Sequence, residues 1–183
     1  MPDALITLTT VLAALWLMAG VLLFQRLTPG YEAHRETISE LATRDAPHQW
    51  TVRLALFLPV GLLCLYPAIL HFLEQNWAVA ALGLALATGY LGAAAFPADP
   101  GSPLGGSLAN RLHNLTGAIM YAGGGISLIA ATGQAPGSLA IGVVTLIGLT
   151  GLGPNDPTGY RGYLQRTLEI FLFFAFFLHA VVP

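Results

Sequence analysis

Six long apolar stretches constrain this chain more than any other feature, because most approach the roughly 20 residues that a helix needs to cross a bilayer. Only 9% of the 183 residues are charged, against about 25% in an ordinary soluble domain. Such a chain cannot cover itself with a solvated surface. The stretches are residues 4–24, 53–71, 77–96, 112–131, 139–153 and 163–182. We therefore expect an all-α polytopic membrane protein, with residues 1–183 forming a single domain, a six-transmembrane-helix bundle.

The longest polar segment connects the first two stretches and covers residues 28–50, TPGYEAHRETISELATRDAPHQW. Tyr31, Ile38 and Leu41 recur in it at helical spacing, with charged residues on the remaining surface. An amphipathic pattern of this kind is typical of a helix that lies in the membrane interface. The sequence thus predicts a short interfacial helix between the first two spans.

The seven basic residues are all arginines, and all lie beside the connections that follow odd-numbered spans. The positive-inside rule places these odd-numbered connections in the cytoplasm. A guanidinium group also binds carboxylate or phosphate through two hydrogen bonds, so the same arginines are candidates for holding an anionic ligand.

Several classes of partner find no support in the composition. The net charge of −2 does not favour nucleic acid. The single cysteine, Cys64, cannot form an intramolecular disulfide, and no motif has the spacing of a metal site. We expect no metal and no other cofactor.

Polar side chains extend from the odd-numbered connections into two spans. Asn110, His113 and Asn114 share one face at the start of the fourth span. In the sixth span, Glu169 lies three residues after Arg166, and a carboxylate inside a span should be neutral or paired. Arg166 is its nearest expected partner, followed by Arg111 or His113. We expect one charged pocket near one membrane surface, whose predicted ligand-binding residues are Glu40, Asp99, Arg111, His113, Asn114, Arg166 and Glu169.

Four segments appear in an order that resembles a known family: GYEAHRETISELA (30–42), FPADPG (96–101), RLHNLTG (111–117) and GYLQRTLE (162–169). They are similar to the bacterial domain of unknown function 998 family and, more distantly, to the damage-regulated autophagy modulator (DRAM) group. The resemblance implies a small six-span protein of the bacterial plasma (inner) membrane with a link to lipid and membrane homeostasis. It also implies that the first connection lies outside, the opposite of what the arginines predict.

Three functions are compatible with these features. The first is binding of a membrane lipid headgroup or a small amphiphilic ligand, with the arginines holding its anionic part. The second is an intramembrane lipid hydrolase or transferase that uses His113 or Glu40 as a base, so whether the protein is an enzyme stays open. The third is a small-molecule or proton-coupled transporter that uses Glu169. No catalytic residue and no oligomeric state are assigned from the sequence.

Overall fold

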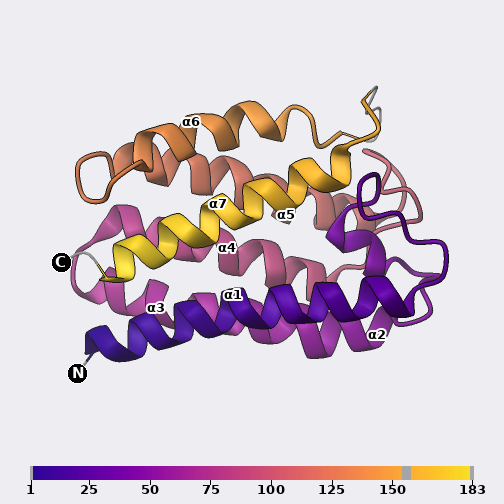
Figure 1. Ribbon diagram of the computed structural model, residues 1–183, viewed down its shortest axis with the longest axis horizontal. Helices are drawn as coiled ribbons and strands as arrows, with labels where there is room; N and C mark the ends of the chain where they lie inside the picture. Colours follow the sequence, from indigo (N-terminus) through magenta and orange to yellow (C-terminus); the bar gives the residue numbers. More distant parts are fainter. Residues whose placement is uncertain (1, 154–157, 182–183) are drawn as a thin grey trace.

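The computed structural model describes residues 2–153 and 158–181, and within them the regular structure is helical. The main helices run side by side along the long axis of the molecule (Figure 1). The start of α1 and the end of α7 lie at one end, and the connection that follows the first helix lies at the other. The main helices are α1 (Pro2–Leu27), α3 (Leu58–Leu73), α4 (Trp77–Ala95), α5 (Leu108–Ala130), α6 (Ser138–Leu149) and α7 (Arg161–Val181).

Four helices in the described part of the chain are long and apolar enough to cross a membrane, judged by length and composition. They are Ala4–Leu27, Gln49–Leu73, Trp77–Ala95 and Arg161–Val181. The second of them joins α2 (Gln49–Thr51), the π-helical turn η2 (Val52–Phe57) and α3 into one continuous helix. The expected membrane-embedded helical protein is thus supported, with four candidate spans.

The two remaining long helices differ from these four for reasons visible in their residues. The first turns of α5 carry Asn110, Arg111, His113 and Asn114, which lower its mean hydropathy. The 12 residues of α6 extend only about 18 Å at 1.5 Å per residue, less than the roughly 30 Å of a hydrocarbon core. Both helices nevertheless pack along the bundle, α5 on α4 and α6 on α5.

The helices form a ring that the last one closes. Each main helix packs on its neighbour in sequence, and α7 returns to pack on α1 while also contacting α4 and α5. Close approach depends on small residues, as packing in lipid generally does. A Cβ added at Gly83 of α4 would lie 2.8 Å from both the Cβ of Ala68 in α3 and the ring of Phe176 in α7. The ring brings side chains of α7 to the centre of the bundle.

Pro59 interrupts the backbone ladder near the start of α3, and α1 compensates for it. A proline has no amide to donate to the carbonyl four residues earlier, here that of Ala55. The indole Nε1 of Trp16 in α1 donates to this Ala55 carbonyl oxygen at 2.8 Å. The contact supplies the free carbonyl with a donor from a neighbouring helix, as bundles in lipid require.

The connection of residues 28–50, in which the pattern predicts a short amphipathic interfacial helix, contains no α-helix before α2 begins at Gln49. It folds into turns and one five-residue 3-10 helix, η1 (Ile38–Ala42), which packs against α1 and α7. Thr37 and Glu40 form a capping box that starts η1, and Thr43 is already extended. Ile38 and Leu41 are apolar because the bundle end covers them. Their spacing reflects this burial and not a longer helix.

Candidate functional site

Glu169 lies at the centre of the bundle and is paired with two tyrosines. Its side chain in α7 is buried. Its Oε2 accepts a hydrogen bond from the hydroxyl of Tyr90 in α4 at 2.7 Å, and its Oε1 accepts one from Tyr121 in α5 at 2.9 Å. Both carboxyl oxygens of this buried group therefore have a hydrogen-bond partner, as buried polar groups generally require. The predicted pairing with Arg166 is therefore replaced by two hydroxyl donors from other helices.

Arg166 instead fastens the first connection to α7. Its Nη1 donates to the carbonyl oxygens of Ala33 at 2.8 Å, Glu36 at 3.0 Å and Gly162 at 2.9 Å, and its Nη2 donates to the hydroxyl of Tyr31 at 2.6 Å. These contacts give the guanidinium group a fixed position at the end of the bundle.

Tyr31 completes this arrangement from the connection side. Burial raises the pKa of Tyr31 to about 12, although the nearby Arg166 opposes the rise. The phenol therefore stays protonated at neutral pH. It is within donating distance of the carbonyl oxygens of Glu36 at 3.1 Å and Thr37 at 2.8 Å while accepting from Arg166.

Glu40 forms a buried ion pair with Arg161, the first residue of α7. One guanidinium nitrogen, Nη2, lies 2.8 Å from each carboxylate oxygen, and the two side chains are 6% and 10% exposed. Glu40 Oε2 also accepts from the amide of Thr37 at 2.6 Å. The pair joins η1 to the start of α7, so Glu40 is engaged within the protein.

Asp99 organises the turn before α5. Its carboxylate accepts from the amide of Ser107 at 2.7 Å and from the Ser107 hydroxyl at 2.9 Å. These two hydrogen bonds hold the pKa of the Asp99 carboxyl below its ordinary value. The amide of Asp99 donates to Asn110 Oδ1 at 2.9 Å, which fixes the turn on the first residues of α5.

Arg111 lies on the outer surface of α5. Its side chain is exposed, and within residues 2–153 and 158–181 it forms no hydrogen bond or ion pair with another side chain. The structure therefore separates it from the other predicted site residues.

His113 and Asn114 line a cavity of about 370 Å³ between α5, the end of α6 and the start of α7. We call it the polar cup, after its polar lining residues Thr37, Ser39, Ser102, His113, Asn114, Tyr121, Thr150, Arg161 and Gln165. His113 Nδ1 lies 2.9 Å from the carbonyl oxygen of Phe96, which can only accept, so Nδ1 carries the hydrogen. Asn114 Nδ2 donates to the carbonyl oxygen of Pro103 at 2.8 Å.

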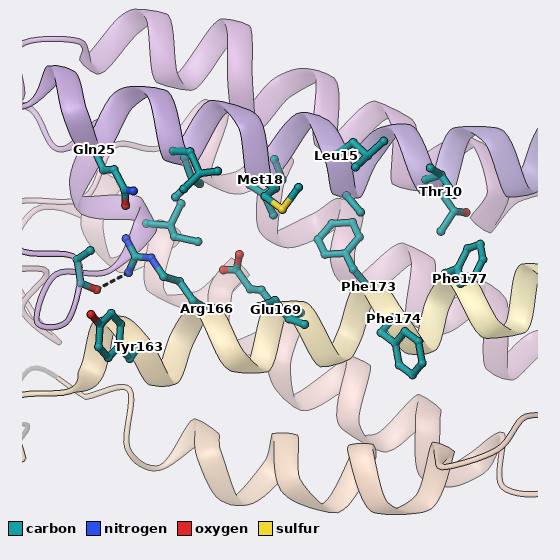
Figure 2. Close-up of a pocket in the computed structure, with 18 residues that line it drawn as sticks. Thr10, Leu15, Met18, Gln25, Tyr163, Arg166, Glu169, Phe173, Phe174 and Phe177 are labelled. Atoms are coloured by element: carbon teal, nitrogen blue, oxygen red, sulfur yellow. Dashed lines mark hydrogen bonds between the residues drawn. The ribbon is translucent and has the colours of Figure 1, made fainter.

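A larger cavity of about 730 Å³ runs between α1 and α7, and we call it the α1–α7 groove. Figure 2 shows its lining side chains, with Gln25, Tyr163 and Arg166 gathered at one end. Glu169 lies next along α7, and the rest of the groove is apolar apart from Thr10 at the far end. Its apolar walls include Leu15, Met18, Phe173, Phe174 and Phe177.

The seven predicted residues do not share one cavity. Arg166 and Glu169 line the α1–α7 groove, and His113 and Asn114 line the polar cup. The other three (Glu40, Asp99 and Arg111) line neither. The two cavities lie on either side of α7, and the hydrogen bond from Tyr121, which lines the cup, to Glu169, which lines the groove, connects them.

Sequence reasoning missed the residues that complete these contacts. Tyr90 lies in the apolar third stretch. Its phenol among alanines and leucines was the feature that could have indicated a buried hydrogen bond. Gln165 was not predicted as a site residue. It lines the polar cup, and its Oε1 accepts a hydrogen bond from the amide of Ile38 at 2.6 Å. Within the described part of the chain, no group of three or more His, Cys, Asp and Glu side chains could hold a metal ion.

Comparisons with known proteins give one match. Comparisons with curated proteins and with solved structures found none. A family model described as "Protein of unknown function (DUF998)" matches residues 11–182, nearly the whole chain. The family resemblance drawn from the four sequence segments is thereby confirmed, while the more distant similarity to the DRAM group stays a prediction. The chain belongs to the DUF998 family of proteins of unknown function.

Proposed function

We propose that this protein binds a membrane amphiphile in the α1–α7 groove, with the anionic part of the ligand at Arg166 and its chain along the apolar walls. The observation that carries the proposal is the polarity of the groove, which has a cation at one end and mostly aromatic and aliphatic side chains beyond Glu169. Its volume of about 730 Å³ is within the roughly 300–1,000 Å³ of typical small-molecule sites.

The position of the groove suits entry from the bilayer. It lies between the first and last helices of the ring, and several of its lining side chains are exposed, including Leu15, Met18, Ile170 and Phe174. Exposed apolar side chains on these candidate spans would face lipid chains. A lipid molecule could therefore move sideways into the groove without crossing a polar barrier.

Arg166 is a suitable anchor for an anionic group because other contacts already hold it in place. Its hydrogen bonds to the first connection and to Gly162 of α7 occupy both hydrogens of Nη1 and one hydrogen of Nη2. Within the described part of the chain, its Nε and the second hydrogen of Nη2 have no hydrogen-bond acceptor. A fixed guanidinium with remaining donors matches phosphate or carboxylate geometry.

We further propose that α5 and α6 cross the bilayer with the four candidate spans, which gives six spans in a bacterial plasma membrane. Support comes from their packing alongside α4 and α7. The arginines all lie beside the odd-numbered connections, which by the positive-inside rule supports a cytoplasmic position for this end of the bundle. The hydrolase or transferase alternative has weaker support, because Glu40 is engaged by Arg161.

Filling the groove tests the proposal. Ala14 lines the groove, whereas Ala19 lies on an exposed face of the same helix, outside it. Lipid retained by purified protein would be quantified by native mass spectrometry for wild type, Ala14→Phe and Ala19→Phe. We expect Ala14→Phe to lose the bound lipid and Ala19→Phe to retain it. Equal lipid content in all three proteins would contradict the proposal.

A further inference from the structure

The polar groups of the α1–α7 groove follow a fixed order with depth. Arg166 lies nearest the first connection, and Glu169 lies three residues further along α7, about 4.5 Å deeper at 1.5 Å per residue. Beyond Glu169 the α7 wall consists of Ile170, Phe173, Phe174 and Phe177. A ligand that matches this order has its anionic group outermost, a hydrogen-bond donor one turn deeper and an apolar chain beyond the donor.

Glu169 has capacity for such a donor. A carboxylate offers about four lone-pair positions, and the hydroxyls of Tyr90 and Tyr121 occupy one on each oxygen. The facing wall of α1 at this depth is apolar and includes Met18 and Val21. No side chain of that wall supplies a donor, so the remaining acceptor positions of Glu169 suit a donor that arrives with the ligand.

The order of groups excludes the common diacyl phospholipids as the best match. In these lipids only ester oxygens, which are acceptors, lie between the phosphate and the chains. The amine or hydroxyl groups of their headgroups lie on the other side of the phosphate, away from the chains. A phosphate at Arg166 would then place acceptors against the acceptor oxygens of Glu169, which is unfavourable in a dry site.

We propose that the groove selects a single-chain phosphate amphiphile with a free hydroxyl between phosphate and chain, the arrangement of a lysophosphatidate. Its hydroxyl and phosphate ester are carried by adjacent carbons, a spacing that suits the one-turn separation of Arg166 and Glu169. The hydroxyl donates to Glu169 while the phosphate accepts from Arg166. This inference rests on the proposed function, because it names the ligand class for the same groove.

The test compares three probes on delipidated protein in detergent: oleoyl lysophosphatidate, its analogue oleoyl propanediol phosphate, which lacks the hydroxyl, and dioleoyl phosphatidate. Dissociation constants would be measured by native mass spectrometry. Since the analogue cannot make the hydrogen bond to Glu169, we expect lysophosphatidate to bind about tenfold more tightly than the analogue. Dioleoyl phosphatidate should bind more weakly than lysophosphatidate.

Two variants separate Glu169 from its surroundings. Glu169→Gln should lose most of the preference for the hydroxyl, measured as the ratio of the dissociation constants of the two single-chain probes. Tyr90→Phe is the matched control, because Tyr90 also contacts Glu169 but does not line the groove. It should keep the preference. If Glu169→Gln does not fold, the ratio of the dissociation constants of the two single-chain probes for the wild-type protein still decides the inference.

The outcomes distinguish this inference from the proposed function. Equal affinity for the two single-chain probes, or tighter binding of dioleoyl phosphatidate, with all binding lost in Ala14→Phe, would overturn the inference alone. A preference that persists in Glu169→Gln would also overturn it. Absence of binding for every probe, or binding that Ala14→Phe does not reduce, would overturn the proposed function as well.

Discussion

Arg161 and Glu40 are 121 residues apart in the chain, yet one guanidinium nitrogen lies 2.8 Å from both carboxylate oxygens. The pair links η1 to the first residue of α7, and both side chains are nearly inaccessible to water. Together with the contacts of Arg166, it attaches the first connection to the last helix. The polar end of the α1–α7 groove, where Ala33 and Ile38 join Arg166, depends on this attachment.

Glu40→Ala should strongly destabilise the protein. Removing one partner of a buried ion pair typically costs about 3 kcal/mol or more, and the substitution also removes the acceptor for the Thr37 amide. Thermal unfolding in detergent would measure the loss. Glu32→Ala is the matched control, because Glu32 pairs with Arg35 on the exposed surface and such pairs contribute about 1 kcal/mol or less. Similar unfolding temperatures for the two variants would contradict the prediction.

Trp16→Phe should cost about 1 kcal/mol through loss of one hydrogen bond, and the cost should depend on Pro59. In the Pro59→Ala background, the backbone amide at position 59 is available to the Ala55 carbonyl, so the indole donor is no longer needed. A double-mutant cycle of unfolding free energies measures this coupling. Additive effects of the two substitutions would show that the Trp16 contact does not compensate for the proline.

Asp99 should make the stability of the protein sensitive to acid. Its pKa is lower in the folded chain than in the unfolded chain because of its hydrogen bonds to Ser107. The resulting stabilisation is fully present above the unfolded pKa of about 3.9 and disappears as the pH falls through the lower folded value. The decrease in unfolding temperature below about pH 4 should therefore be smaller in Asp99→Asn. The exposed Asp45 provides the control, since Asp45→Asn should follow the wild-type curve.

Gly83→Ala and Gly117→Ala should have opposite effects on stability. At Gly83 an added Cβ would lie 2.8 Å from atoms of two neighbouring helices, and overpacking of this kind costs about 1–3 kcal/mol. At Gly117 nothing lies within 4 Å of the added atom, so the gain in helix propensity of up to about 1 kcal/mol should remain. Unfolding temperatures that fall equally in both variants would contradict the packing of α3, α4 and α7.

The sequence predicts the helices better than it predicts the site. Apolar length and composition predict the helical bundle and its candidate spans, because hydrophobic transfer depends on local composition. The partner of Glu169 depends on how α4 and α5 face α7, which no local pattern encodes. Arg166 is closer in sequence than Tyr90 and Tyr121, but the backbone carbonyls of the first connection and Tyr31 surround its guanidinium.

The start of α5 illustrates the same limit. His113 and Arg111 are two residues apart, yet one lines the polar cup and the other is exposed. Helical periodicity predicts that they face different directions, but it does not say which face is covered. Asp99 was predicted as a site residue from its charge. Its carboxylate instead accepts hydrogen bonds from the amide and hydroxyl of Ser107 in the same turn.

The closure of the ring by α7 has a consequence for biogenesis. A nascent chain that stops before residue 161 has no carboxylate for Tyr90 and Tyr121 and no guanidinium around which the first connection can fold. Insertion of α7 thus completes the buried hydrogen bonds of Tyr90 and Tyr121 and the contacts that hold the first connection. A chain truncated before α7 should therefore lack one wall of both cavities, so neither cavity forms until α7 has been inserted.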